Sequence, residues 1–297
     1  MTTSKDKTLI IIEADPNKDI FFRKWEANGY QAAVIFRKVN KPLRAIRRLF
    51  ARYDNPLLAL WLNDWYGKLD DYDSIIIHMS RLTRFLPKLL ACKYPHLKVI
   101  CWYWNTIDED TLPIDFHNDR ISYWSFDEDD CRKYGLNFNI QYYCPLKKEE
   151  GLEKENDIYF IGRDKGREEK IREVEEMARN QGLLTNFHII KEEKDLIPYY
   201  QVEEDLLKTR AVLEINKKEQ IGFTLRVMES LFYGLKLITD NKAIRNSRIY
   251  NPTNIFILDE DDPKLLKQFM NKPYDHSVDI YQKEYDLNTW FNNFYKD

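Results

Sequence analysis

The chain has 297 residues, of which 43% are hydrophobic and 14% aromatic. Because a single core usually serves about 150 residues, this length predicts two domains and excludes a peptide hormone or one small binding module. The 46 basic and 49 acidic side chains nearly balance, which argues against a dedicated nucleic-acid coat and against a disordered acidic tail. We therefore expect no nucleic-acid partner.

The sequence favours a cytoplasmic location. Its four cysteines form no C-x-x-C pair and no short secreted scaffold, so reduced thiols are expected. The first residues lack the apolar stretch of a signal peptide, and no segment reaches the roughly 18 apolar residues of a membrane span.

Short apolar runs alternate with longer segments of helical period in both halves of the chain. The expected strands are 8–12, 32–36, 74–78, 98–103, 121–126, 158–161, 186–190, 211–215, 236–239 and 254–258, and the expected helices include 43–53, 56–66, 82–93, 167–181, 224–233 and 263–270. Continuous apolar strands between helices form parallel sheets that are covered on both faces. We therefore expect an α/β protein with two Rossmann-like domains that face a central cleft.

A polar, charge-dense run at 145–156 begins with proline and contains glycine, as exposed connections between domains do. It divides the chain into a first domain, 1–150, and a second domain, 151–297. The last stretch, 277–295, is aromatic and polar, and we expect a helix there that packs back on the first domain.

One candidate phosphate site follows the first strand of the second half. Gly162 at the end of this strand lets backbone approach a ligand, and Arg163 and Lys165 stand beside the start of a helix, where a phosphate group is stabilised. The segment is neither a P-loop nor a dinucleotide fingerprint. The alternative is a charged surface turn.

A second candidate site lies in 211–241, where a strand, a polar loop, a short helix and another strand follow one another. Thr224 can cap the helix, which carries Arg226 and Glu229 three residues apart on one face. The two side chains can therefore reach one ligand. The alternative is that they pair only with each other on the surface.

Segment 220–229, followed by 231–241 and supported by 250–255, resembles the GT-B glycosyltransferases, in particular bacterial enzymes that build capsule, exopolysaccharide or lipopolysaccharide glycans. The resemblance implies that the second domain holds a nucleotide sugar, that Glu229 contacts its ribose or sugar, and that 222–224 lie at the diphosphate. The family's second glutamate, eight residues earlier, is absent: Ile221 stands there, and Gln220 is the nearest polar residue. The expected substrate-binding residues are Gly162, Arg163, Lys165, Gln220, Gly222, Thr224, Arg226, Glu229 and Asn241.

The first domain should supply the acceptor site and a catalytic base. Glu13, Asp15 and His78 follow or end two expected strands, at the edge where ligands of parallel sheets bind. Each could accept a proton from an acceptor hydroxyl. The alternatives are a hydrogen-bonded structural histidine and an aspartate that only forms a turn before proline.

Acidic clusters at 108–110, 127–130 and 259–262 resemble the D-x-D with which GT-A transferases hold a cation. In so highly charged a chain, solvated loops are the better explanation of three such clusters. The histidines have no metal-binding spacing. We expect no metal and no cofactor other than the nucleotide sugar as co-substrate. A cation-dependent GT-A transferase and a non-catalytic module that binds nucleotide or glycan remain alternatives.

Basic residues dominate 23–52, and Lys41, Arg44, Arg48 and Arg52 share one helical face, while Leu43, Ile46 and Phe50 share another. Such a helix can lie on anionic lipid, which would place the protein on the inner face of the membrane. The alternative is an ordinary helix whose apolar side faces the core.

The leading expectation is therefore a metal-independent glycosyltransferase of hexosyltransferase type. An acceptor hydroxyl of a glycan or lipid-linked substrate attacks the anomeric carbon of the donor sugar, and a nucleoside diphosphate leaves. Arg163, Lys165 and the amides of 222–224 would stabilise the charge that develops on this leaving group.

Overall fold

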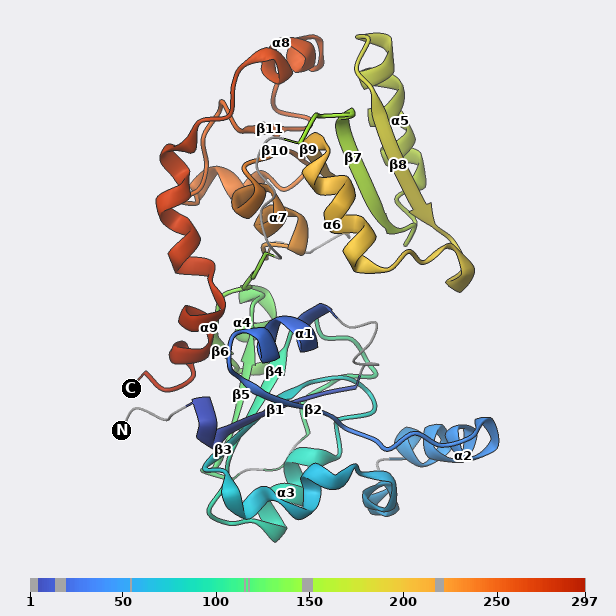
Figure 1. Ribbon diagram of the computed structural model, residues 1–297, viewed down its shortest axis with the longest axis vertical. Helices are drawn as coiled ribbons and strands as arrows, with labels where there is room; N and C mark the ends of the chain where they lie inside the picture. Colours follow the sequence, from blue (N-terminus) through green and yellow to red (C-terminus); the bar gives the residue numbers. More distant parts are fainter. Residues whose placement is uncertain are drawn as a thin grey trace. The chain divides into compact units, whose positions relative to one another are not determined.

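The computed structural model describes residues 5–13, 20–53, 55–114, 116, 118–145, 152–216 and 222–296. The chain divides into two compact units, as Figure 1 shows. Unit 1 comprises Met1–Ile140 together with Asn292–Asp297, and unit 2 comprises Gln141–Phe291.

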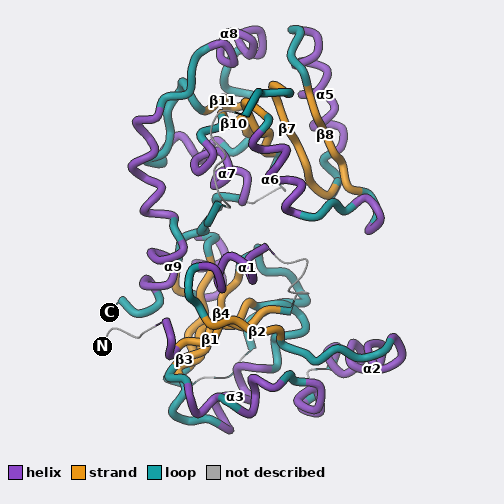
Figure 2. Tube along the Cα trace, in the orientation of Figure 1, coloured by secondary structure: helices purple, strands orange, loops and turns teal. Residues whose placement is uncertain are grey.

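Unit 1 is built on a parallel sheet of six strands in the order β2-β1-β3-β4-β5-β6. The strands are β1 (Thr8–Ile12), β2 (Gln31–Val34), β3 (Ser74–His78), β4 (Lys98–Tyr103), β5 (Ile121–Ser125) and β6 (Asn137–Phe138). Every residue of β1 and β3 is buried, because both faces of these central strands are covered. In Figure 2, α1 lies on one side of these strands and α3 on the other.

The helices of unit 1 are α1 (Ile20–Ala27), α2 (Lys41–Arg52), α3 (Leu86–Lys93) and α4 (Glu128–Tyr134). Capping side chains lie at the start of two of them, α2 and α4. The side chain of Asn40 accepts a hydrogen bond from the Leu43 amide at the start of α2. The single helix expected at 56–66 is instead two 3₁₀ helices, Pro56–Trp61 and Asp64–Gly67, because Asn63 caps a new turn between them.

Unit 2 contains a parallel sheet of five strands in the order β11-β10-β9-β7-β8. The strands are β7 (Asn156–Arg163), β8 (Thr185–Ile190), β9 (Thr209–Glu214), β10 (Lys236–Thr239) and β11 (Ile255–Ile257), and the helices are α5 (Glu168–Asn180), α6 (Tyr199–Leu207), α7 (Leu225–Tyr233) and α8 (Leu266–Asn271). A further helix, α9 (Leu287–Asn293), begins in unit 2 and ends in unit 1. Alternate strand residues pack on opposite faces: α6 and α7 cover one face, and α5 and α8 cover the other. Each unit is thus a layered α/β domain.

The strand order fixes where a ligand is expected in each unit. In unit 1, β1 lies between β2 and β3, and in unit 2, β7 lies between β8 and β9. The chain therefore reverses its direction of winding between β1 and β3 and between β7 and β9. Open parallel sheets bind ligands beyond the carboxyl ends of the strands at such a reversal.

The last residues of the chain pack on unit 1. The ring of Phe294 meets Trp102 and Trp124 edge-on, with centroids 5.9 and 5.2 Å away. The Tyr295 hydroxyl lies 2.7 Å from the Ser74 hydroxyl at the start of β3. The stretch 277–295 falls mainly in a 3₁₀ helix, His276–Tyr285, and in α9. None of the described helices is both long and apolar enough to cross a membrane.

Candidate functional site

Arg167 bridges the reversal point of unit 2. It precedes α5, and its guanidinium donates to the backbone oxygen of Arg163 at the end of β7, at 2.6 Å, and to that of Ile215 just after β9. The Asp164 carboxylate accepts from the amides of Arg167 and Glu168, at 3.0 and 2.9 Å, and so caps the helix. Burial lowers the pKa of Arg167, with nearby Asp240 opposing that shift. A guanidinium is therefore fixed where ligands of such sheets bind.

Gly162 leaves the room that Arg167 needs. A Cβ added at Gly162 would lie 3.4 Å from a guanidinium nitrogen of Arg167 and 3.2 Å from the Phe160 ring. Arg163 and Lys165 are exposed beside it. Lys165 has φ 49° and Gly166 φ 77°, so the backbone makes a left-handed turn here. Three cationic side chains thus lie at the end of β7 and in the turn that follows it.

Glu214, at the end of β9, anchors the second candidate segment. Its carboxylate is buried and accepts hydrogen bonds from the hydroxyls of Thr224 and Thr239, the latter at 2.5 Å. Burial raises the pKa of Glu214, although the two threonine hydroxyls work against this shift. Thr224 also accepts from the Arg226 amide at 3.1 Å and so caps α7, as the sequence predicts. Asn241 is buried and caps the turn after β10 by accepting from the Ala243 amide.

Arg226 and Glu229 form an ion pair. The sequence left such a pair open as the alternative to ligand binding, but it lies inside the unit and not on its surface. The Glu229 side chain has 0% of its surface exposed, and that of Arg226 has 17%. Tyr199 of α6 donates to the second carboxylate oxygen of Glu229. Burial opposes the charge on Arg226, but the Glu229 carboxylate raises the pKa of the guanidinium above its usual value. The contact of Glu229 with a ribose or sugar stays a prediction.

A chain of buried hydroxyls continues from this ion pair, and nothing in the sequence pointed to it. The Tyr143 hydroxyl lies 3.0 Å from that of Tyr199 and donates to Glu203 at 3.2 Å. Tyr233 donates to the same Glu203 oxygen at 2.8 Å. Since these residues come from distant segments, no spacing could have revealed the network.

Two of the expected residues lie outside the described part of the chain, Asp15 and Gln220. Gly222 is described and is half-buried just before α7. Their roles stay predictions.

Glu13 and Ser80 meet at the reversal point of unit 1. Glu13 follows β1 and is exposed, and the Ser80 hydroxyl, two residues after β3, donates to its carboxylate at 2.5 Å. The Ser80 amide donates to the Thr83 hydroxyl at 2.7 Å, which fixes the turn. Burial lowers the pKa of Arg47 in α2, and the charge of the nearby Glu13 carboxylate opposes this shift. An accessible carboxylate is therefore present where a base is expected.

His78 is placed differently from Glu13. It is 2% exposed, and its ring lies edge-on to Trp25, with centroids 4.7 Å apart, and 5.9 Å from Trp104. Burial lowers the pKa of His78 to about 3, so the imidazole is neutral at physiological pH. A base must come within hydrogen-bond reach of its proton donor, and of the two described candidates only Glu13 is exposed.

Carboxylates of the acidic clusters accept hydrogen bonds from backbone amides. Asp127 caps α4 by accepting from two amides, and Asp130 accepts from the Ile107 amide at 2.8 Å. Asp262 caps the 3₁₀ helix before α8. Across the described residues, no three His, Cys, Asp or Glu side chains converge as ligands for a metal ion.

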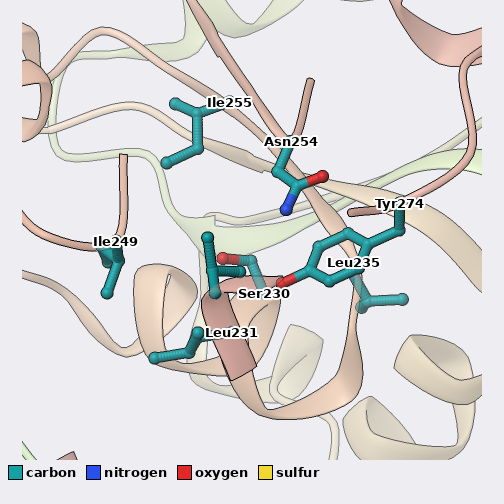
Figure 3. A pocket seen from close by; sticks show the side chains of 8 residues that line it. Ser230, Leu231, Leu235, Ile249, Asn254, Ile255 and Tyr274 are labelled. Atoms are coloured by element: carbon teal, nitrogen blue, oxygen red, sulfur yellow. The ribbon is translucent and has the colours of Figure 1, made fainter. Parts of the chain in front are cut away.

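A small pocket, shown in Figure 3, lies away from the candidate site. It measures about 230 Å³, part of which is open to solvent, whereas ligand pockets usually span about 300–1,000 Å³. Leu235 and Asn254 in its lining directly precede β10 and β11, so it lies at the amino end of the strands. It is therefore not part of the edge where Arg167 lies.

Solved structures resemble the whole chain, although no protein-family model and no curated protein matches its sequence. Sucrose-phosphate synthase from Thermosynechococcus elongatus has a TM-score of 0.55 and 10% identity, over 97% of this chain and 98% of that one. HepE from Anabaena, solved with UDP and glucose, has a TM-score of 0.52 and 9% identity over 97% and 98%. A glycosyltransferase from Rickettsia africae has a TM-score of 0.50 and 8% identity over 97% and 96%.

The fold is of the GT-B type. The expected pair of Rossmann-like domains is confirmed, since each unit holds a parallel sheet with helices on its faces. The alternative of a GT-A transferase is wrong with regard to the fold, because GT-A transferases have a different one. At such low identity the likeness concerns the fold alone.

Proposed function

We propose that the protein is a metal-independent glycosyltransferase that transfers a hexose from a nucleoside-diphosphate sugar to a glycan or lipid-linked acceptor in surface-polysaccharide assembly. The observation that carries this proposal is the group of Arg163, Lys165 and Arg167 at the carboxyl edge of unit 2. The GT-B fold supports it, as does the binding of UDP and glucose by the neighbour HepE.

The group suits a leaving diphosphate for a physical reason. Arg167 is held by one backbone oxygen at the end of β7 and another just after β9, so its guanidinium needs little reorganisation when a ligand arrives. Arg163 and Lys165 are exposed and can turn toward an anion. Each charge-assisted hydrogen bond to the diphosphate would contribute about 1.5–3 kcal/mol. Charge developing on the leaving group can thus be stabilised without a cation.

Arg226 is the second donor contact that the geometry favours. Its ion pair with Glu229 leaves it partly exposed beside Thr224, while Glu229 itself is buried. We propose that Glu229 orients Arg226 toward the donor. A direct contact between Glu229 and the sugar would require this ion pair to open.

Glu13 is the proposed base of unit 1, with Asp15 and His78 as the other candidates. Its carboxylate is exposed and oriented by the Ser80 hydroxyl. In the proposed reaction it takes the proton of the acceptor hydroxyl as that oxygen attacks the anomeric carbon. The bond from that carbon to the diphosphate oxygen breaks, and the electron pair leaves with the nucleotide. We propose that this takes place in the cytoplasm.

Calorimetry with UDP, GDP and dTDP tests the donor site. At least one nucleotide should bind, and Arg163→Ala or Lys165→Ala should each weaken that binding about tenfold or more. Lys267→Ala is the matched control, because its ammonium lies near Gly182 at the opposite end of α5. If no nucleotide binds, or if both variants bind as tightly as the wild type, the site assignment is wrong.

A further inference from the structure

Several large apolar side chains of unit 1 are exposed on α2 and on the turn that follows it. On α2, Leu43 is 40%, Ile46 43% and Leu49 54% exposed. In the following segment Tyr53 is 71%, Leu57 50% and Leu60 62% exposed. These side chains form what we name the α2 surface, and Figure 1 shows α2 projecting from the sheet of its unit.

The α2 surface differs from the alternative weighed for this helix, in which its apolar side faces the core. Among the α2 side chains that the structure describes, only Ala51 is buried, and the Phe50 ring packs against Trp61 with centroids 5.5 Å apart. Leu43, Ile46 and Leu49 follow one another at intervals of three residues, so they lie along one side of the helix. Clusters of exposed apolar side chains mark interaction sites.

Basic side chains occupy another face of the same helix. Lys41, Arg44 and Arg48 are exposed on α2, and Arg37 and Lys38 are exposed just before it. The sequence of α2 contains no acidic residue. An occupant of the α2 surface must therefore combine an apolar layer with negative charge at its border.

We propose that the α2 surface binds the face of an anionic lipid bilayer. Leu49, Leu60 and their apolar neighbours would enter the region between headgroups and acyl chains, while Arg44 and Arg48 contact lipid phosphates. A bilayer offers apolar acyl chains directly beneath charged phosphates. Helices that combine an apolar side with basic residues bind such a surface reversibly. Charge complementarity favours this occupant over a second copy of the chain, whose own α2 surface carries the same charge.

The same helix also borders the candidate base, a point that rests on the proposed function. The Arg47 guanidinium lies over the Phe36 ring, 4.3 Å from its centroid, and interacts electrostatically with Glu13. A membrane that touches the outer side of α2 would present lipid-linked molecules near this carboxylate. The acceptor class that fits is therefore a glycan on a lipid anchor.

Vesicle co-sedimentation tests the proposal. Wild-type protein should bind vesicles rich in phosphatidylglycerol at about 0.15 M salt and should not bind pure phosphatidylcholine vesicles. Arg44→Glu with Arg48→Glu should weaken binding about 25-fold or more, since each basic contact contributes about fivefold. Leu49→Ser with Leu60→Ser should weaken it about tenfold or more through lost insertion.

Matched controls come from unit 2. Leu184 is 63% exposed, close to the 62% of Leu60, so Leu184→Ser should leave vesicle binding unchanged. Lys264→Glu with Lys267→Glu, at two exposed lysines, controls for net charge. The proposal is overturned if wild-type protein does not bind anionic vesicles, or if both α2 variants bind them like the wild type. It is also overturned if sedimentation equilibrium shows a dimer for the wild type and a monomer for the leucine variant.

Transfer to a soluble acceptor analogue separates this proposal from the proposed function. Without vesicles, the α2 variants should transfer sugar as fast as the wild type, because none of the changed residues belongs to the donor site or the base. A wild type that binds anionic vesicles but consumes no sugar nucleotide would support the membrane contact and contradict the proposed function together with its lipid-linked acceptor.

Discussion

The Glu229 carboxylate is fully buried and paired with Arg226, three residues earlier on the same helix. Tyr199 donates to its other oxygen, so both oxygens are engaged within unit 2. The residue that the resemblance assigns to sugar contact is therefore also a residue that holds an arginine in place. The loss of Glu229 should therefore lower both stability and donor affinity, whereas the loss of Arg163 should lower donor affinity alone.

Glu229→Gln should lower the free energy of unfolding by about 3 kcal/mol, because removing one partner leaves the Arg226 charge uncompensated in a mostly buried site. Arg163→Ala should change it by less than about 0.5 kcal/mol, since this side chain is exposed. Urea denaturation measures both. Nucleotide affinity should fall in both variants. Equal stability of wild type and Glu229→Gln would show that the pair is not formed as described.

His78 predicts a loss of stability in mild acid. Burial lowers its pKa to about 3, while an unfolded chain has the ordinary value near 6.5. The unfolded state therefore binds more protons below pH 6.5, and stability should fall with pH down to about 3. The loss at pH 5 should be about 2 kcal/mol. Denaturation between pH 7 and pH 5 should show this slope in the wild type and a shallower one in His78→Leu. The exposed His188→Leu is the control, and an identical slope in all three would contradict the buried neutral imidazole.

Glu13→Gln should reduce kcat by about 10²–10⁴-fold, the range for loss of a general base. Donor affinity should stay unchanged, because Glu13 belongs to unit 1 and the donor residues to unit 2. Asp15→Asn and His78→Leu should be assayed beside it. If only Asp15→Asn or His78→Leu abolishes turnover, Glu13 is not the base.

Turnover should survive EDTA, because Arg163, Lys165 and Arg167 can neutralise the leaving diphosphate without a cation. The measurement is initial rate with chelator, with added Mg²⁺ or Mn²⁺ and with neither. A rate that disappears with EDTA and returns with either ion would contradict metal independence.

The sequence predicted the central strands well. The expected strands at 8–12, 74–78, 98–103 and 236–239 coincide with β1, β3, β4 and β10, because continuous apolar runs between turn signals are characteristic of buried parallel strands. The short edge strand β6 escaped notice, since two exposed residues form no pattern. Helix α6 was also missed, because its acidic and aromatic residues lack a clear apolar period.

The candidate site was only partly predictable. The resemblance pointed to Glu229 and the strand end pointed to Arg163, but Arg167 emerged only from its hydrogen bonds to Arg163 and Ile215. Tyr199 and Tyr143 approach Glu229 through tertiary packing, which leaves no trace in residue spacing. Likewise, the sequence could place Ser80 near a strand end but could not show that it orients Glu13.

The central claim is tested most directly by nucleotide release from UDP-, GDP- and dTDP-sugars, measured with a glycan or lipid-linked acceptor, in wild type and in a variant that combines Arg163→Ala with Lys165→Ala. The account predicts that at least one donor yields nucleoside diphosphate and glycosylated acceptor in equal amounts, and that the variant loses about 100-fold or more of kcat/KM. Lys267→Ala should match the wild type. Binding of a sugar nucleotide in thermal-shift assays without any turnover would contradict this account and favour a non-catalytic nucleotide-binding module.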